Sequence, residues 1–436
     1  MPMIALVDCN NFYVSCERAL DPSLKSRPVV VLSNNDGVII SRSNEVKAMG
    51  IPMAAPVHKY KDIIARNKVV VFSANFGYYM TMSEKVNKVV REYSPEVEMY
   101  SVDEAFLSLE GMEWKGLRRY MKEMHDHILS TVDLPVSVGI ARTKTLTKVA
   151  SELVKKDPTS DGIGLMTEQA DIDAKLRKLP VGDVWGIGPR TTEFLTSKEV
   201  NIHTAFDLKS APEEWVRRNL HVTGLRTVME LRGLPCINVE TVQEAPKSVM
   251  RSRSFGKYIT SLAEMREAVS FFASAVGEVL RSENCVADHI GVFFNTNRFN
   301  KDDKHFGSKG TRLSEPTASS QILIRYALEL LEKEWQEGYR YNKAGVVATG
   351  ITRAKSLQLE LGHSERIERG LRAITTVDTL NSKYHHNLIS LASQGTGFNW
   401  RSKQENLSAA PQEYIRPTQR YRFMPYVPMS VGKSVL

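Results

Sequence analysis

Two adjacent acids interrupt a strand-forming run, YSVDEAFLSL at residues 100–109, which is otherwise rich in β-branched, aromatic and aliphatic residues. If strand alternation held throughout, the carboxylates of Asp103 and Glu104 would point to opposite faces, and one would face the apolar side. Because burying an unpaired carboxylate is costly, either a turn intervenes or a positive charge compensates. Taken alone, the segment favours a surface hairpin corner, where Asp is common.

A third acid, Asp8, lies far away in the sequence, at the end of the short apolar run IALV at residues 4–7. This position is typical of a metal ligand, although Asp is also well suited to cap a helix. If Asp8 met Asp103 and Glu104 in the fold, the three carboxylates would repel strongly unless divalent cations lay among them. Hard oxygen ligands in this number suit Mg²⁺, and the two-metal site of polymerases needs such a set.

Separated motifs follow one another in a recognisable order: NNFYVSCE at 10–17, RPVVVLSNNDGVIISRSNEVKAMGI at 27–51, YSVDEAF at 100–106 and PVSVGIARTKTLTKVASELVKK at 135–156. Together with Asp8, these motifs resemble the Y family of translesion DNA polymerases, in its bacterial UmuC branch. The resemblance implies an α+β multidomain fold of the right-hand polymerase type. Its parts would be a palm, fingers, a helical thumb with a helix-hairpin-helix, and an α+β little finger.

Turn-rich and linker-like segments divide the chain. DPTSDGIG at 157–164 closes a part in which strand-like and helix-like stretches alternate, and a linker precedes a part with two strand–helix–strand patterns. Strands are predicted at 4–7, 29–32, 69–72, 97–102 and 136–140, and helices at 83–93, 116–131 and 143–155. The resemblance implies a palm at 1–24 and 76–166, fingers at 25–75, a thumb at 167–237, a linker at 238–246, a little finger at 247–355 and a UmuC-type tail at 356–436.

Composition restricts the cellular setting and the class of partner. The 58 Lys and Arg residues exceed the 50 Asp and Glu residues, and the net charge of +8 suits a polyanion without identifying one. The four cysteines show no CxxC or zinc spacing, so we expect reduced, buried thiols. The N-terminus has no charged leader before an apolar stretch, and no apolar run approaches the roughly 18 residues of a membrane span. We therefore expect a cytoplasmic protein with no membrane segment.

The resemblance implies a polymerase site built on the three acids. Asp8, Asp103 and Glu104 would be catalytic and would hold two Mg²⁺ ions, with the backbone carbonyl of Cys9 as a further ligand. One ion would activate the primer 3′-hydroxyl, and the other would neutralise charge on the β- and γ-phosphates.

A nucleotide-binding set is implied as well. Lys47 and Lys155 would contact the triphosphate, although without the resemblance both would be interpreted as solvated charges on helix faces. Lys47 stands where several relatives have Arg, so it keeps the charge but not the bidentate fork. The remaining contacts would come from the Ser41 hydroxyl and from the backbone amides of Asn11, Phe12 and Tyr13.

Tyr13 lies where the family keeps a sugar-discriminating side chain, the steric gate, whose ring would collide with the 2′-hydroxyl of a ribonucleotide. From its neighbours alone, the pair Phe12 and Tyr13 could equally be core residues at the start of a helix. Val38 and Ile40 would cover the nascent base pair with little bulk. Distorted template bases could then enter the site.

Two segments are predicted to contact DNA. Gly186 and Gly188, within LPVGDVWGIGPRTTEFL, look like a helix-hairpin-helix turn whose backbone approaches a phosphate, although a helix C-cap before a Pro-initiated helix would have the same pattern. At strand spacing Arg251 and Arg253 share one face, where they would follow phosphates or else solvate an edge strand. Their segment, KSVMRSRSFGKY, has no acid and carries Lys247, Arg251, Arg253 and Lys257.

The C-terminal part suggests partners. TTVDTLNSKY at 375–384 and FNWRSKQENLS at 398–408 resemble the UmuC branch, which implies a cleaved UmuD-type (UmuD′) dimer and a RecA filament beside primer–template DNA and dNTP. Where that branch has a clamp-binding segment with an aromatic anchor, this chain reads QLELG, from Gln358 to Gly362. Sliding-clamp contact should therefore be weak or absent. After Ser408 the sequence departs from the family ending.

Two classes of function fit the sequence. The first is an error-prone, template-directed translesion DNA polymerase that acts in an SOS-type damage response and in mutagenesis. The second is a non-catalytic DNA-binding checkpoint subunit that acts with RecA filaments. The complete set of acids favours the enzyme, because a pure binder has no reason to keep adjacent carboxylates beside phosphates.

Overall fold

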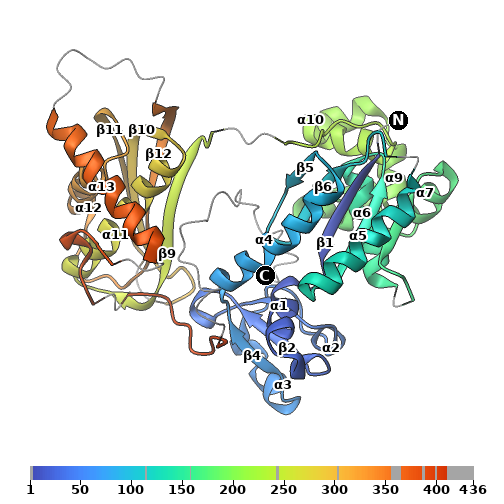
Figure 1. The fold of residues 1–436 in the computed structure, drawn as a ribbon, viewed down its shortest axis with the longest axis horizontal. Helices are drawn as coiled ribbons and strands as arrows, with labels where there is room; N and C mark the ends of the chain where they lie inside the picture. Colours follow the sequence, from blue (N-terminus) through green and yellow to red (C-terminus); the bar gives the residue numbers. More distant parts are fainter. Residues whose placement is uncertain are drawn as a thin grey trace. The chain divides into compact units, whose positions relative to one another are not determined.

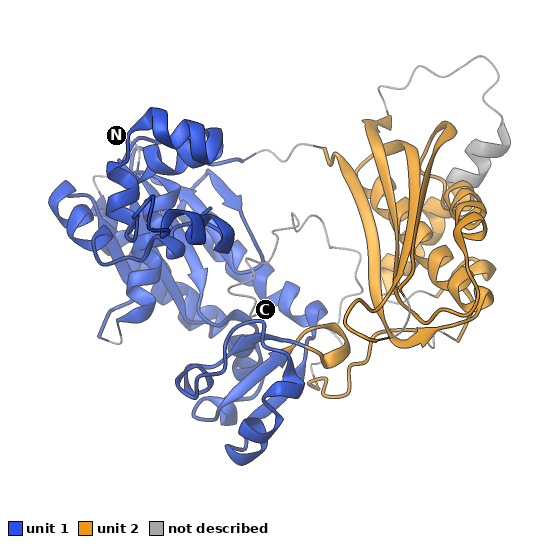
Figure 2. Cartoon of the chain, turned by 180° about the vertical axis from the view of Figure 1, so that it is seen from behind, with its two compact units in different colours: residues 1–31, 38–242, 423–436 blue, residues 32–37, 243–422 orange. Residues whose placement is uncertain are grey.

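The computed structural model describes residues 3–112, 115–157, 159–241, 245–301, 304–354, 365–384, 388–397 and 400–409, with the backbone alone for 365–371. The chain forms two compact units, shown in Figures 1 and 2. Unit 1 comprises Met1–Val31 and Val38–Val242, and unit 2 comprises Leu32–Gly37 and Gln243–Arg422. The longer segment of unit 2 thus starts within 238–246, the range predicted as a linker, and Leu32–Gly37 of the predicted fingers groups with the same unit.

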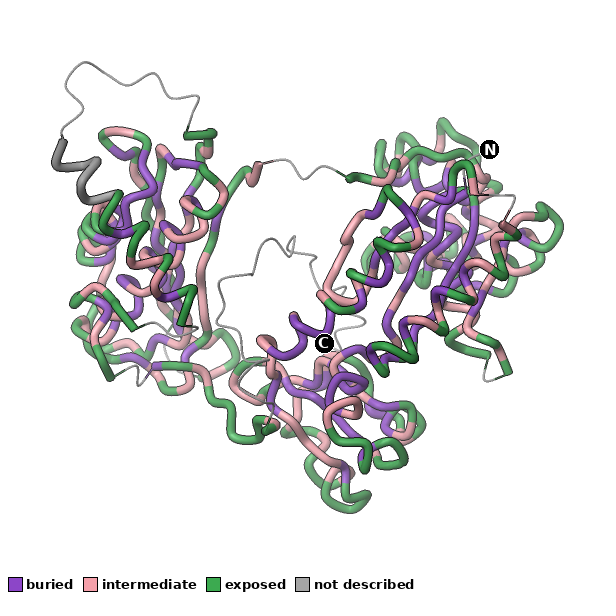
Figure 3. Tube along the Cα trace, viewed as in Figure 1, coloured by how far each residue is buried: buried purple, intermediate pink, exposed green. Residues whose placement is uncertain are grey.

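The larger sheet of unit 1 runs in the order β5-β6-β1-β7-β8, so β1 lies at its centre. Neighbouring strands are antiparallel except β7 and β8, which are parallel. β1 and β7 are aliphatic runs buried along most of their length, as the purple trace of Figure 3 shows. The strands span Ile4–Cys9 (β1), Val97–Met99 (β5), Glu104–Ser108 (β6), Val136–Ala141 (β7) and Ile163–Met166 (β8).

Helix α6, Lys144–Lys156, packs closely on this sheet, against β1, β7 and β8. Its first turn is capped by the Thr143 hydroxyl, which accepts from the Leu146 amide. A Cβ at Gly139 of β7 would lie 2.0 Å from the Thr147 carbonyl oxygen, so glycine is required for this approach. The other helices of this region are α1 (Phe12–Leu20), α4 (Phe76–Tyr93) and α5 (Leu117–Val132).

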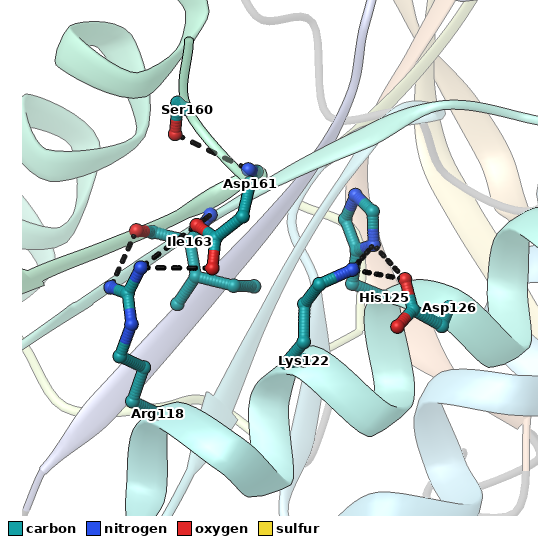
Figure 4. Close-up of polar contacts among 8 residues, drawn as sticks. Arg118, Lys122, His125, Asp126, Ser160, Asp161 and Ile163 are labelled. Atoms are coloured by element: carbon teal, nitrogen blue, oxygen red, sulfur yellow. Dashed lines mark hydrogen bonds and ion pairs between the residues drawn. The ribbon is translucent and has the colours of Figure 1, made fainter.

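A polar cluster joins α5 to the loop before β8, as Figure 4 shows. Arg118 donates to both carboxylate oxygens of Asp161, at 2.8 and 2.9 Å, and to the Ile163 carbonyl at 3.0 Å. On the following turns of α5, Lys122 and His125 both contact the Asp126 carboxylate. The cluster includes none of the residues predicted for catalysis or binding, so its evident role is to fix the loop.

The smaller sheet falls within the predicted fingers and runs in the order β3-β2-β4. In β3 the side chains alternate, with Ile39 and Ser41 buried and Ile40 and Arg42 partly exposed. Its strands are β2 (Val29–Leu32), β3 (Ile39–Arg42) and β4 (Val70–Ser73). Short helices surround them: α2 (Asn44–Ala48), α3 (Lys61–Arg66), and the 3-10 turns η1 (Pro22–Leu24), η2 (Asn34–Asp36) and η3 (Val57–Lys59).

A helical region follows and shares an apolar core with α6. Gly186 adopts φ +89°, a conformation that favours glycine, and Gly188 is the N-cap of a helix that begins at Pro189. The element before this turn is a short 3-10 turn rather than a long helix. The region contains α7 (Gln169–Leu176), η5 (Val181–Asp183), α8 (Pro189–Leu195), α9 (Ala205–Ser210) and α10 (Glu213–Leu231).

Unit 2 contains an antiparallel sheet in the order β11-β10-β12-β9, with α11 and α12 packed against it and against each other. Ser261 caps α11 by accepting from the Glu264 amide, and the apolar stripe of this helix enters the core. The chain order is β9 (Ser248–Ile259), α11 (Leu262–Ser282), β10 (Cys285–Thr296), β11 (Phe306–Thr317), α12 (Ser320–Glu334) and β12 (Tyr341–Arg353). These are the two strand–helix–strand patterns predicted from the sequence.

The C-terminal segment packs onto the same unit. In α13 (Glu365–Tyr384), Asp378 accepts two hydrogen bonds from Arg281 of α11, at 2.6 and 2.9 Å. After the 3-10 turn η7 (Ala392–Gln394), Trp400 is buried against Phe255, Phe271 and Phe272. This segment therefore completes the core of unit 2.

Other expectations from the sequence concern the cysteines, the C-terminal end and membrane-spanning helices. Cys9, Cys16 and Cys285 are buried free thiols, but Cys236 is exposed, because it lies in the loop after α10 rather than in a core. The QLELG segment and the ending after residue 409 lie outside the described residues. Within the part that the structure describes, no helix has the length and apolar character needed to cross a membrane.

Candidate active site

The three predicted acids meet where β1 and β6 lie side by side. Asp8 pairs with Glu104 in the antiparallel register, so their side chains point to the same face. Asp103 ends the turn between β5 and β6, and its carbonyl accepts from the Cys9 amide at 2.9 Å. Ser101 stabilises this turn by donating from its hydroxyl to the Asp103 carboxylate at 2.6 Å. The adjacent acids therefore stand at a hairpin corner, and strand alternation does not separate them.

Two lysines of α6 form ion pairs with two of these acids. Lys155 Nζ lies 2.5 Å from a carboxylate oxygen of Asp8, and Lys148 Nζ lies 2.6 Å from one of Glu104. Lys148 also lies over the rings of Tyr100 and Trp185, at 4.7 and 5.5 Å from their centroids. Both explanations considered for the adjacent acids therefore hold: a turn lies beside Asp103 and Glu104, and positive side chains compensate part of the charge.

Burial makes the negative charge costly here. Burial, with the charges of Glu104 and Asp103, raises the pKa of Asp8 to about 7, against the lowering effect of Lys155. Burial also raises the pKa of Asp103, against the hydrogen bond from Ser101. Burial lowers the pKa of Lys155, but its contact with Asp8 outweighs this and the net shift is upward. The site therefore holds more negative charge than its surroundings compensate.

The chemistry of these acids fits a divalent cation. They offer only hard oxygen donors, and a bound cation would offset both the burial and the repulsion that raise the pKa of Asp8. Among the described residues, no three His, Cys, Asp or Glu side chains already converge as a metal cluster. Lys155 and Lys148 each form an ion pair with one of these carboxylates, and a bound cation would replace both ion pairs.

The predicted triphosphate contacts lie around the start of α1. The Ser41 hydroxyl accepts from the Val14 amide at 3.3 Å and donates to the Asn11 carbonyl at 3.2 Å. Asn11 is the N-cap residue, with φ 48°, so the amides of Phe12 and Tyr13 belong to the first turn of α1. Ser41 therefore fixes the backbone that was predicted to bind phosphate.

Positive charge gathers close to this backbone. Lys47 of α2 is largely exposed, yet partial desolvation lowers its pKa, and the positive charges of Arg42 and Lys155 lower it further. Lys155 is held by Asp8, and Arg42, which we did not predict, donates to the Ile51 carbonyl.

Tyr13 lies in an aromatic cluster. Its ring stacks on Tyr79 of α4, with centroids 4.8 Å apart and an interplanar angle of 28°, and it meets Phe76 edge-on at 5.9 Å. Phe12 is buried, whereas Tyr13 is only partly buried. Of the two aromatic residues, Phe12 is thus the core residue, and Tyr13 lies at the edge of the core.

Arg251 and Arg253 lie on β9, which pairs with β12 alone among the described strands. Their partners in the register are Val346 and Ala344, which are fully buried. Because opposed residues of antiparallel strands share a face, both arginines are on the helix-covered face, each partly exposed. They do share a face, as alternation predicts, but any phosphate contact would require their long side chains to reach past the edge.

Lys148 was missed in the sequence. It precedes Lys155 by two helical turns, a spacing that places both on one face of α6. That spacing is visible in KVASELVKK, which begins at Lys148, but it gains meaning only when α6 is known to pack on β1.

Comparisons with known proteins agree with this arrangement. The sequence profile of the impB/mucB/samB family matches residues 7–152, and that of the family's C-terminal domain matches residues 246–361. A domain of unknown function matches residues 372–411, the segment that carries Asp378 and Trp400.

Similar proteins cover nearly the whole chain. Protein UmuC of Salmonella typhimurium is 38% identical over 93% of this chain and 97% of its own length. Protein ImpB of Salmonella typhimurium is 37% identical over 93% of this chain and 96% of its own. DNA polymerase IV of Bacillus velezensis is 28% identical over 88% and 91% of the two chains.

The fold matches a solved structure, a Y-family DNA polymerase chimera of Dbh and Dpo4, with a TM-score of 0.61 and 17% identity, over 80% of this chain and 99% of that one. The fold therefore defines the class, a right-hand Y-family DNA polymerase. Within this class the chain belongs to the impB/mucB/samB family, as a UmuC-type member. It is a translesion DNA-directed DNA polymerase, a nucleotidyltransferase of a class that depends on divalent metal ions.

Proposed function

We propose that this polymerase adds dNTPs to a primer 3′ end opposite damaged template, with low fidelity, in an SOS-type response that causes mutagenesis. The observation that carries the proposal is the meeting of Asp8, Asp103 and Glu104 beside two lysines of α6. Primer extension on a lesion-containing template, by the wild type and by variants of the acids, tests it.

The three acids and the Cys9 carbonyl would hold two Mg²⁺ ions. When bound, these ions would lower the pKa of the primer hydroxyl and neutralise phosphate charge. The protein's own part would be to keep Asp8 and Glu104 opposite each other in the strand register and to hold the Asp103 carboxylate by its hydrogen bond from Ser101. The hairpin corner thereby acts as a preorganised support.

The nucleotide would be held by charge and by backbone. Lys47 and Lys155 would bind the triphosphate, and the amides at the start of α1 would donate to it, with Ser41 and Asn11 fixing that turn. When the triphosphate binds, Lys155 would exchange its contact with Asp8 for the phosphates. Lys155 would thus compensate part of the negative charge in the empty site and the phosphate charge in the loaded site.

Tyr13 would exclude ribonucleotides by its ring. Val38 and Ile40 are partly exposed small aliphatic residues of the fingers segment, so they would cover the base pair without excluding a distorted template base. For partners we propose a UmuD′-type dimer and a RecA filament, by likeness to Protein UmuC. Contact with a sliding clamp would be weak or absent.

Removing the charge of Asp103 should stabilise the metal-free protein. In EDTA at pH 8, Asp103→Asn should raise the melting temperature by about 2–4 °C, which corresponds to about 1 kcal/mol in a domain of this size. The sign follows because a raised carboxyl pKa penalises the folded state above the unfolded pKa, and the penalty is lost as pH falls through the folded pKa. The increase in melting temperature caused by Asp103→Asn should therefore be smaller at pH 5 than at pH 8. Differential scanning calorimetry measures the melting temperature at each pH.

Adding Mg²⁺ should then raise the melting temperature of the wild type more than that of Asp103→Asn, because the ion stabilises only the state that binds it. Glu110→Gln is the matched control, since this exposed acid follows the far end of β6. An equal response to Mg²⁺ in wild type and Asp103→Asn would remove Asp103 from the metal site.

The basic segment of β9 should act through phosphates. Replacing Arg251 and Arg253 by Gln should weaken primer–template binding alike for all sequences. It should also flatten the slope of log affinity against log salt by roughly one to two units, at about 0.7–0.9 per phosphate contact. Fluorescence anisotropy over a salt series measures this.

Arg266→Gln with Arg325→Gln is the matched control, because these arginines lie on α11 and α12 of the same unit. An unchanged salt slope in the Arg251/Arg253 variant would mean that these arginines only solvate an edge strand and do not contact phosphates. Loss at selected sequences alone would indicate base readout instead.

A further inference from the structure

A second tyrosine, which is wholly buried, packs behind the ring of Tyr13. Tyr79 of α4 is 1% exposed, and its ring stacks on Tyr13 with centroids 4.8 Å apart. Phe76, one turn earlier on α4, meets the rings of Tyr13 and Tyr79 edge-on, at 5.9 and 6.3 Å. Tyr13 thus cannot move toward α4 unless Tyr79 moves as well.

Tyr79 is itself fixed by a buried carboxylate. Its hydroxyl donates to Glu17 Oε1 at 2.5 Å, a distance in the range of charge-assisted hydrogen bonds. Glu17 is 1% exposed, so the carboxylate has given up most of its contact with water. Burial and the charge of Glu17 both raise the pKa of Tyr79, so the phenol stays protonated and remains a donor.

Glu17 follows Tyr13 by one helical turn on α1, so the two side chains lie on the same side of that helix. Tyr79 contacts both, through its ring and through its hydroxyl respectively. Tyr79 of α4 therefore links the Tyr13 ring to the Glu17 carboxylate, both of which belong to α1, and we call these three residues the brace.

A tie between α1 and α4 does not by itself require this acid. The neighbouring Tyr78 is also buried, and its hydroxyl donates to the Cys16 carbonyl of α1 at 3.0 Å. That bond joins the same two helices without a buried charge. The Glu17 carboxylate adds a bond to the hydroxyl of Tyr79, the residue whose ring stacks on Tyr13.

We propose that Glu17 and Tyr79 are positioning residues for sugar selection, in which the carboxylate fixes Tyr79 and the Tyr79 ring keeps Tyr13 against the incoming sugar. The inference rests on the proposed role of Tyr13 as the steric gate. A gate excludes one hydroxyl group only if its ring resists displacement by about the size of that atom, and a rigid second layer supplies the resistance.

The test is the ratio of kcat/KM for dNTP to kcat/KM for rNTP in single-nucleotide primer extension by the full chain. Two variants address the two halves of the brace. Tyr79→Leu removes the stacked ring, and Glu17→Leu with Tyr79→Phe removes both polar partners while keeping a ring. Each should lower the ratio by about two- to twelvefold, the worth of one aromatic pair or one net hydrogen bond.

Tyr78→Phe is the matched control, because it deletes an equally buried hydroxyl between the same helices but leaves the stack on Tyr13. It should leave the ratio unchanged. Glu17→Gln keeps an acceptor oxygen for Tyr79, so it should fold and retain the ratio to within about twofold. Thermal melting and dNTP turnover, followed for each variant, separate loss of selection from loss of folding.

The Tyr13→Ala background distinguishes positioning from direct contact. If Tyr79 acts through Tyr13, then Tyr79→Leu should cause no further loss in that background. An equal loss there, or an unchanged ratio in folded Tyr79→Leu while Tyr13→Ala loses selection, would overturn the inference and leave the gate intact. If Tyr13→Ala itself keeps selection, the gate fails and the inference fails with it.

Discussion

Replacing Asp103 or Glu104 by alanine is expected to lower primer extension by roughly three orders of magnitude or more, which is about 4 kcal/mol of lost transition-state stabilisation. The reason is that both acids lie beside Asp8, and burial raises the pKa of Asp8 and of Asp103 there. Affinity for primer–template should stay within a few fold, because the acids are proposed to hold metal rather than DNA. Single-turnover extension and anisotropy measure the two quantities separately.

Glu110→Ala is the control for this experiment. Glu110 comes after β6 at the end opposite Glu104 and is exposed, so its loss should leave extension unchanged. Normal extension by either Asp103→Ala or Glu104→Ala would remove the acids from catalysis. A large loss of DNA affinity in either variant would indicate a folding defect instead.

Replacing Tyr13 by alanine is expected to raise ribonucleotide incorporation relative to deoxyribonucleotide incorporation by roughly 30- to 150-fold. This range corresponds to about 2–3 kcal/mol, the usual cost of forcing an extra group into a packed site. The physical reason is that the partly buried ring of Tyr13, stacked on Tyr79, would occupy the space of a 2′-hydroxyl. Competition between rNTP and dNTP in primer extension measures the ratio.

Tyr13→Phe is the control, because it keeps the ring and removes only the phenolic hydroxyl. It should exclude ribonucleotides as the wild type does. If Tyr13→Ala remains active and discriminates as before, Tyr13 is a residue of the aromatic core and not a gate.

Much of the fold follows from local patterns in the sequence. The β-branched runs that became β2 and β7 each contain their own signal, so their positions were predicted closely. The predicted strand at 97–102 was too long, because Ser101 turns the chain and β6 begins at Glu104. A side-chain hydrogen bond of this kind overrides strand propensity, and no periodicity reveals it.

The acids of the site could be predicted, but their compensation could not. Asp8, Asp103 and Glu104 stand out because like charges in apolar runs need an explanation. Lys148 and Lys155 look like ordinary helix charges until α6 is packed on β1. The buried pair Glu17 and Tyr79 is likewise invisible, since its members come from helices far apart in the sequence.

Alternation predicted that Arg251 and Arg253 share a face, but it could not say which face. That depends on the register with β12, where Ala344 and Val346 are buried under the helices. The face on which a strand side chain lies is therefore set by the register with the partner strand, and that partner is known only once the whole fold is known.

The most direct measurement is primer extension across an abasic template by the full chain with dNTPs and Mg²⁺, with and without a UmuD′-type dimer and RecA with ATP. We expect the wild type to extend primers past the lesion when the partners are present, and Asp103→Ala to bind the same DNA and give no product. Equal products from the wild type and Asp103→Ala would contradict catalysis by the acids. A wild type that binds primer–template but extends nothing, with every partner present, would instead favour a non-catalytic checkpoint subunit.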